Sequence, residues 1–233
     1  MRIGIISDAH GNARAFHRAI WLLKREGAQS FVFAGDAVGY LPGIAVVRAL
    51  MDMGTAVRCV RGNHDAMLLD GWLSDADPVY QLSRSAAMLD AGARAFMESW
   101  PESLVLDTTA GRILVVHGSP SAPLTGYVYP DSDLAVHEID ATFVCMGHTH
   151  RPFVRKHQGR VFVNVGSCGL PRDVGTLGSA ALLDTVTGVV DLIRFDIRED
   201  LELAISELGP VHPDVRALLT RTGEARGRVI TDD

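Results

Sequence analysis

The sequence predicts an α/β fold that contains a partly parallel β-sheet. In the first half of the chain, short apolar runs alternate with polar loops and amphipathic helices, which is the repeating unit of such sheets. In the second half, apolar runs are separated by glycine-containing turns, as in hairpins. Hydrophobic residues make up 47% of the 233 residues, which is enough for a full core. This length favours a single domain, with a core over about 1–197 and a C-terminal helical segment and tail over 198–233.

Three strand–loop–helix units are predicted before the middle of the chain. The strands are expected at residues 3–6, 30–34 and 55–60. Asn12 is expected to cap the first helix, because an amide oxygen can accept a free N–H of the first turn. Pro42 is expected in the first turn of the second helix, which runs to about Met53. Residues 65–100 have mainly helical character.

The second half is predicted to contain a hairpin, a long loop and further strands. The hairpin pairs 104–107 with 113–116, the loop covers 119–130, and a short helix covers 131–138. Later strands are expected at 142–146, 152–157, 160–165, 179–184 and 189–196. From Arg198 the pattern is helical, and the tail after Gly223 is expected to be loose.

Composition excludes several classes of protein. The net charge of −6 argues against a protein that coats nucleic acid, and we expect no stable nucleic-acid complex. The three cysteines, Cys59, Cys145 and Cys168, form no Cys-x-x-Cys pair, so a thiolate zinc site and a disulfide framework are not expected. No signal peptide and no apolar run of about 20 residues is visible, which predicts a cytoplasmic protein that does not enter the membrane. The oligomeric state stays open, with a homodimer as one option.

Polar segments rich in metal-ligand residues follow five of the predicted strands. They are Asp8 with His10, Asp36, Asn63 with His64, His117, and His148 with His150. Five of the nine histidines lie in these segments. Because ligands bind beyond the carboxyl ends of strands in open α/β sheets, we expect these side chains to meet in one cleft.

The chemistry of these residues fits a pair of metal ions. Asp8 and His10 stand two apart, so in extended backbone both point to the same side. Imidazole, carboxylate and amide oxygen ligands suit Mn²⁺, Fe, Zn²⁺ or Co²⁺. Asp36 stands alone and can bridge two ions with one oxygen to each, and ions about 3.5–4 Å apart are typical of phosphoryl displacement. Taken singly, each residue has a common structural alternative, such as a helix cap or a turn.

The ordered motifs resemble the calcineurin-like metallophosphoesterase superfamily. The matching segments are Asp8-Ala9-His10, Gly35-Asp36, Gly62-Asn63-His64-Asp65, His117-Gly118 and Gly147-His148-Thr149-His150. Further segments are similar to a small bacterial and archaeal subgroup of phosphodiesterases. These are Gly35-Asp36-Ala37-Val38-Gly39-Tyr40, His117-Gly118-Ser119-Pro120, and Asn164-Val165-Gly166-Ser167 followed by Pro171-Arg172-Asp173.

The resemblance implies an architecture and a set of residue roles. The fold would be a four-layer α/β/β/α sandwich of two mixed β-sheets flanked by helices. One metal would be held by Asp8, His10, Asp36 and His150, and the other by Asp36, Asn63, His117 and His148. The ions would be two divalent transition metals, Mn first, with Fe, Zn, Co or Ni as alternatives. His64 would protonate the leaving group or stabilise the transition state, and Asp65 would orient His64 by accepting its other ring proton.

The predicted function is that of a dinuclear metal-dependent phosphodiesterase acting on a small phosphorylated substrate. A metal-bound hydroxide would attack phosphorus in line with the leaving oxygen, and His64, as an imidazolium, would act as general acid. Asn12, Tyr40 and Arg172 are candidates for substrate contact. The alternative for Arg172 is a surface ion pair with Asp173.

Two other functions remain as alternatives. The first is a phosphomonoesterase or a nucleotide hydrolase, for instance of dinucleoside polyphosphates, because the metal motifs are common to all of these enzymes. The second is a non-catalytic protein-binding scaffold of the same fold, as in a retromer subunit. The retention of all five motif histidines argues against the scaffold.

Overall fold

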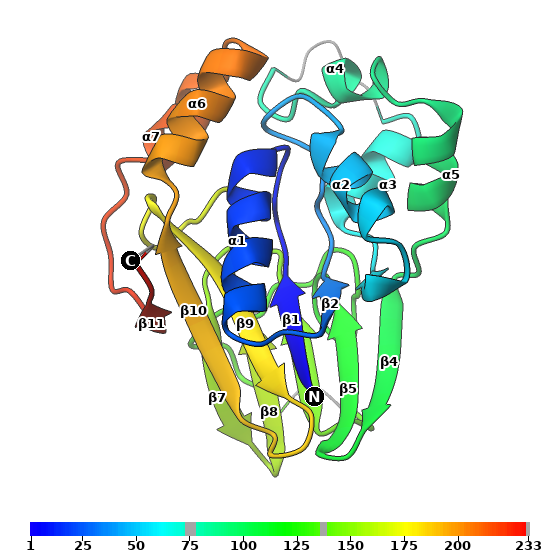
Figure 1. Cartoon of the computed structure of the whole chain (residues 1–233), viewed down its shortest axis with the longest axis vertical. Helices are drawn as coiled ribbons and strands as arrows, with labels where there is room; N and C mark the ends of the chain where they lie inside the picture. Colours follow the sequence, from blue (N-terminus) through cyan, green and yellow to red (C-terminus); the bar gives the residue numbers. More distant parts are fainter. Residues whose placement is uncertain (73–77, 136–138, 232–233) are drawn as a thin grey trace.

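Two mixed β-sheets pack face to face (Figure 1). The computed structural model describes residues 1–72, 78–135 and 139–231. The first sheet contains β1 (Arg2–Ile6), β2 (Ser30–Phe33), β3 (Val57–Cys59), β9 (Leu177–Asp184), β10 (Val190–Asp196) and β11 (Arg228–Val229). The second contains β4 (Ser103–Thr108), β5 (Gly111–Val116), β6 (Phe143–Met146), β7 (Phe153–His157) and β8 (Arg160–Asn164). The strand orders are β11-β10-β9-β1-β2-β3 and β4-β5-β6-β8-β7.

Both sheets combine a parallel centre with antiparallel neighbours. β1, β2 and β3 are mutually parallel, as are β5, β6 and β8. β9 and β10 pair antiparallel beside β1, and the β4–β5 and β7–β8 pairs are antiparallel hairpins. The two mixed sheets expected from the sequence are thereby confirmed.

The helices are short, and most of them lie around the first sheet and above the upper ends of the strands. They are α1 (Ala13–Arg25), α2 (Ala45–Met53), α3 (Asn63–Leu69), α4 (Leu82–Ala86), α5 (Ala91–Glu98), α6 (Arg198–Leu208) and α7 (Pro213–Leu218), with a 3₁₀ turn at Gly54–Ala56. Asn12 caps α1 as expected, because its side-chain oxygen accepts the N–H of Ala15. In the described part of the chain, no helix is both long enough and apolar enough to cross a membrane.

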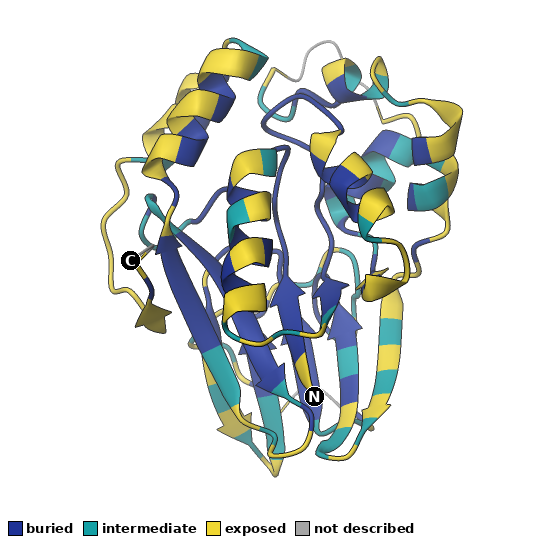
Figure 2. Cartoon of the chain, viewed as in Figure 1, coloured by how far each residue is buried: buried dark blue, intermediate teal, exposed yellow. Residues whose placement is uncertain are grey.

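Successive side chains of the central strands point to opposite faces of the sheet, so the core is divided into layers. Ile3 and Ile5 of β1 pack between the sheets against residues such as Val115 of β5, whereas Ile6 packs toward the helices. On the outer face of the second sheet, Val128, Leu134 and Ile139 from the described parts of 117–142 pack against the strands. No helix occurs in the described residues of that segment. Figure 2 shows buried loops above β1 and β2 and exposed lower ends of the outer strands.

Several predicted elements differ from the structure. Pro42 lies before α2, not in its first turn, because the chain at Leu41 is tied to the loop after β1, where the Leu41 N–H donates to the carbonyl of His10. Residues 131–135 form turns and bends in place of the predicted helix, and 136–138 lie outside the described residues, as do 73–77 of the helical region. The tail is not loose throughout, because β11 pairs with β10.

Candidate metal centre

The polar segments that follow five strands meet at one end of the two sheets. β1, β2 and β3 run parallel in the first sheet, and β5 and β6 run parallel in the second. The loops after these strands therefore share one side of the molecule, at the top of Figure 1. The structure brings together all seven predicted ligands, Asp8, His10, Asp36, Asn63, His117, His148 and His150.

The first group of donors consists of Asp8, His10 and His150. The Nε2 atoms of His10 and His150 lie 3.0 Å apart. Asp8 Oδ1 lies 3.3 Å from the His150 nitrogen and 3.7 Å from the His10 nitrogen. All three side chains are buried, and one donor atom of each lies within 4.8 Å of the others.

The second group contains Asp36, Asn63, His117 and His148. His117 Nε2 lies 3.3 Å from Asp36 Oδ2, 3.0 Å from Asn63 Oδ1 and 3.1 Å from His148 Nδ1. Asp36 Oδ2 also lies 3.7 Å from His10 Nε2 in the first group. Asp36 thus stands between the two groups.

Backbone carbonyl groups orient three of these imidazoles. The Nδ1 atoms of His10, His117 and His150 lie 3.0, 2.8 and 2.5 Å from the carbonyl oxygens of Val38, Ala34 and Leu170. A carbonyl oxygen only accepts, so each Nδ1 carries a proton and, in a neutral ring, leaves Nε2 as a lone pair. For His10 and His150, two lone pairs then face each other at 3.0 Å. This arrangement fits metal coordination, in which a second hydrogen bond fixes the tautomer of a ligand histidine.

The two oxygens of Asp36 have different surroundings. Oδ1 accepts the backbone N–H of His64 at 2.9 Å, whereas Oδ2 alone faces His10 and His117. The expectation that each oxygen would bind one ion stays a prediction, and Oδ2 is the oxygen that these contacts place beside the histidines.

The ligand residues adopt an unusual backbone conformation. Asp8, His10, Asp36, His148 and His150 all have φ between 48° and 66°. Positive φ is uncommon for residues with a Cβ and is concentrated at functional sites. The prediction that Asp8 and His10 share a side because the backbone is extended is therefore wrong, although their side chains do converge.

Glycines beside the ligands allow the loops to approach one another closely. A Cβ at Gly62 would overlap Asp36 Oδ1, and a Cβ at Gly147 would overlap Asp8 Oδ2. Neither glycine has a positive φ, so glycine is needed here because a side chain would not fit, and not because of the backbone conformation. The glycines that precede Asn63 and His148 in the motifs thus have a packing role.

The buried charges interact strongly. Burial alone would raise the pKa of Asp36, but the imidazoles of His117 and His64 hold it below its ordinary value. Burial alone would lower the pKa of His117, but Asp36 and Asp8 outweigh it and raise the pKa to about 10. Burial lowers the pKa of His148 to about 4, and burial together with Arg172 lowers that of His150 to about 4. The rings of His148 and His150 are therefore neutral near pH 7, and each has a lone pair available for a metal.

His64 lies beside the centre in an aromatic enclosure. Its ring centroid lies 5.1 Å from that of His10, 5.0 Å from that of Tyr40 and 4.7 Å from that of Tyr80. Its Nδ1 is buried without a hydrogen-bond partner among the described residues. Burial lowers the pKa of His64 to about 3. One of its nitrogens also lies within 4.8 Å of donor atoms of His10 and Asp36, so geometry alone leaves it within reach of a metal.

Asp65 does not orient His64 in the predicted way. Its carboxylate accepts the backbone N–H groups of Asp36 at 2.8 Å, Ala37 at 2.9 Å and Gly62 at 2.9 Å. It is fully buried. Asp65 therefore ties the Asp36 loop to the start of α3, and the predicted hydrogen bond to the His64 ring is absent from the described structure.

The three substrate-contact candidates lie in different environments. Asn12 is fully buried, caps α1 and donates to the carbonyl of Gly169, so its polar atoms have structural partners. Tyr40 lies edge-on to His10 with ring centroids 4.8 Å apart. Arg172 donates to the hydroxyl of Tyr40 at 2.7 Å. The alternative ion pair between Arg172 and Asp173 is excluded, because Asp173 accepts from both terminal nitrogens of Arg194.

Other residues also lie near the site, and among them Tyr80, Arg151 and Arg221 were not predicted. Tyr80 contacts His64, and Tyr127 lies on His148 with ring centroids 4.2 Å apart. Arg151 and Arg221 line clefts beside Arg172. The place of Arg151 near the site could have been predicted, because it directly follows His150 in the sequence. Nothing in the sequence around Arg221 places it near the strand ends.

Comparisons with known proteins agree with this geometry. A family model for the calcineurin-like phosphoesterase superfamily domain matches residues 1–188. A metallophosphoesterase from Sphaerobacter thermophilus has 27% identity and a TM-score of 0.76, with 94% of this chain and 98% of that chain covered. A hypothetical protein from Pyrococcus horikoshii shares the fold at 23% identity and a TM-score of 0.77, with 96% and 99% covered.

A curated relative is similar over nearly its whole length. It is an uncharacterized protein from Methanocaldococcus jannaschii, 25% identical over 245 residues, which cover 94% of this chain and 98% of that protein. Together with the strand-end geometry, the family model leads to one conclusion. The chain belongs to the calcineurin-like phosphoesterase superfamily.

Proposed function

We propose that this protein is a phosphodiesterase that uses two divalent transition-metal ions to hydrolyse a small phosphorylated substrate. One observation supports this most strongly: Asp36 Oδ2 lies between the two groups of donors. In addition, backbone carbonyls bind the Nδ1 atoms of His10 and His150, so that their facing Nε2 atoms carry lone pairs. Membership of the phosphoesterase superfamily supports the same reaction class.

The proposed ligand sets follow the two groups. Asp8, His10, Asp36 and His150 would hold one ion, and Asp36, Asn63, His117 and His148 would hold the other. Bound divalent ions activate water as a nucleophile and neutralise charge on phosphoryl oxygens. Mn²⁺ is the first candidate for these nitrogen and oxygen donors, with Fe, Zn²⁺, Co²⁺ or Ni²⁺ as alternatives.

His64 is proposed to act on the leaving oxygen. A neutral imidazole still carries one N–H, so a hydrogen bond to that oxygen does not require an imidazolium. Full proton transfer would require the negative charge of a bound phosphoryl group to raise the pKa of His64 from about 3. Tyr40 and Arg172 are proposed to contact the substrate beside this ring, because the Arg172 guanidinium is held against the Tyr40 hydroxyl.

The metal dependence can be tested with stripped and reloaded protein. Chelated protein should hydrolyse neither bis(p-nitrophenyl) phosphate nor p-nitrophenyl phosphate, and Mn²⁺ should restore activity, higher on the diester. His150→Ala should lower the bound metal and the activity together. His17→Ala is the matched control, because His17 is exposed on α1. Full activity of the chelated protein would refute the proposal, and a higher rate on the monoester would favour the phosphomonoesterase alternative.

The role of His64 needs a separate test. His64→Ala should retain the bound metal of the wild type and lose more activity on a diester with a poor leaving group than on one with a good leaving group. Equal losses on both substrates would exclude the general-acid role. A loss of metal content would place His64 among the ligands.

A further inference from the structure

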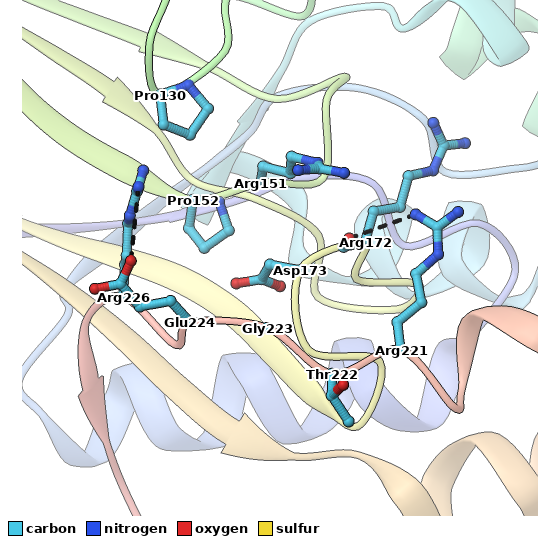
Figure 3. Close-up of a pocket in the computed structure, with 10 residues that line it drawn as sticks. All are labelled: Pro130, Arg151, Pro152, Arg172, Asp173, Arg221, Thr222, Gly223, Glu224 and Arg226. Atoms are coloured by element: carbon cyan, nitrogen blue, oxygen red, sulfur yellow. Dashed lines mark hydrogen bonds and ion pairs between the residues drawn. The ribbon is translucent and has the colours of Figure 1, made fainter.

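A cluster of three arginines lies where two clefts meet. The first cleft has a volume of about 400 Å³ and the second of about 490 Å³. Arg151, Arg172 and Arg221 line both, and are called the arginine trio below. Figure 3 shows the guanidinium groups of Arg172 and Arg221 at one end of the first cleft and Arg226, beside Glu224, at the other.

The carboxylates around the trio have other partners. Asp173 pairs with the buried Arg194 at 2.6 Å, and Glu224 lies 4.0 Å from Arg226. Asp214 lies 3.5 Å from His212. Among the described residues, no member of the trio has a carboxylate within 4.0 Å, and their side-chain hydrogen bonds go to the Tyr40 hydroxyl and a backbone carbonyl.

An uncompensated cluster of this kind needs an explanation. The chain has 28 acidic and 22 basic residues, so partners of opposite charge are abundant. Three neighbouring positive charges repel one another and attract anions into the clefts that they line. An anion from outside the chain would supply the opposite charge that the described residues around the trio do not provide.

The trio adjoins the metal centre directly. The backbone N–H of Arg172 donates to the carbonyl of His150 at 3.2 Å, and Arg151 follows His150 in the chain. The Arg172 side chain reaches Tyr40, whose ring lies against His10. An anion held by the trio would therefore be a neighbour of a phosphoryl group at the metals.

We propose that the arginine trio binds a second, non-scissile phosphate of the substrate, so that the preferred substrate is a phosphodiester with an additional terminal phosphate. This rests on the proposed phosphodiesterase function. A guanidinium fork matches phosphate geometry. A terminal phosphate carries about −1.5 to −2 near neutral pH, which suits three positive charges better than a single carboxylate does.

The test compares two substrates with the same scissile bond. The Mn²⁺-loaded protein is assayed on a thymidine dinucleotide with and without a 5′-phosphate. We expect kcat/KM to be at least about tenfold higher for the phosphorylated dinucleotide, and Arg151→Gln or Arg221→Gln to reduce this ratio about tenfold each. Arg58→Gln, an exposed arginine on β3, is the charge-matched control and should keep the ratio.

A binding measurement separates this proposal from the catalytic one. Inorganic pyrophosphate is titrated into metal-free protein, and each of the two trio variants should weaken binding about tenfold relative to wild type and Arg58→Gln. The proposal is overturned if the wild type has the same kcat/KM on both dinucleotides, or if the two trio variants keep the wild-type ratio of kcat/KM. It is also overturned if these variants bind pyrophosphate as tightly as the wild type. If the loaded protein hydrolyses neither dinucleotide nor bis(p-nitrophenyl) phosphate, the proposed function fails, and the pyrophosphate comparison alone decides on the trio.

Discussion

The substitution Asp65→Asn tests whether Asp65 holds the ligand loops or serves His64. In the structure its Oδ2 accepts the N–H groups of Asp36 and Gly62, and its Oδ1 accepts that of Ala37. An asparagine that keeps its oxygen at the Oδ2 position retains two of these bonds. Its NH₂ group then faces the Ala37 N–H, so two donors oppose each other in a fully buried place.

The expected loss of stability follows from this geometry. One hydrogen bond to an ionised acceptor is removed, at about 1.5–3 kcal/mol. The two that remain become neutral and weaken to roughly half. We expect the free energy of unfolding to fall by about 3–6 kcal/mol. Because the loop that carries Asp36 loosens, metal affinity should fall by about ten- to a hundredfold.

The assay is urea unfolding together with calorimetric titration of Mn²⁺ into metal-free protein. Both are measured at pH 8, because burial and the nearby Asp36 raise the pKa of Asp65 to about 7. Asp70→Asn is the control, since Asp70 is exposed at the other end of the same helix. Unchanged stability and metal affinity, with the same activity profile as His64→Ala, would refute this reasoning and restore the role predicted from the sequence.

Three further predictions concern the surroundings of the site. Arg194→Met leaves the Asp173 carboxylate with no partner in a partly buried pair and should destabilise the fold by about 3–5 kcal/mol in urea unfolding; a change below about 1 kcal/mol would show that the pair is not needed. Gly147→Ala places a methyl group against Asp8 Oδ2, so the purified variant should bind less metal than wild type, and normal metal content would contradict the packing role. The pKa of His117, raised to about 10, stabilises the metal-free fold fully below about pH 6.5, and this stability should be lost by about 1.4 kcal/mol per pH unit as the pH rises from 6.5 to 10. Melting temperatures of chelated protein that stay constant over that range would exclude a charged His117.

The convergence of the seven predicted ligands could be foreseen because it depends on local rules. Parallel strands place their carboxyl ends at one edge, so a polar segment after each of several apolar runs predicts convergence. Asp36, His117 and the other five predicted ligands meet for that reason. The helix cap at Asn12 was predictable in the same way, because it involves residues only three positions apart.

The features that were not predicted depend on contacts between distant segments. The hydrogen bond from the Asp36 N–H to Asp65 joins residues 29 positions apart, and the local sequence pattern cannot predict such a contact. β11 pairs with β10 although it contains only Arg228 and Val229, and both residues are exposed. Arg221 reaches the clefts only because α7 brings the chain back toward the strand ends, a consequence of tertiary packing.

The strained ligand loops are stabilised by one another. Non-glycine residues in the left-handed region cost about 1–3 kcal/mol each, so this conformation persists only where the surroundings impose it. The Asp8 N–H donates to the carbonyl of Gly35, and the His10 N–H donates to that of Asp36. The Ser167 hydroxyl donates to the carbonyl of Asp8 at 2.6 Å. Because each ligand loop hydrogen-bonds to the next, the donors are held in place by the fold itself, and ligand substitutions in different loops should show non-additive effects on stability.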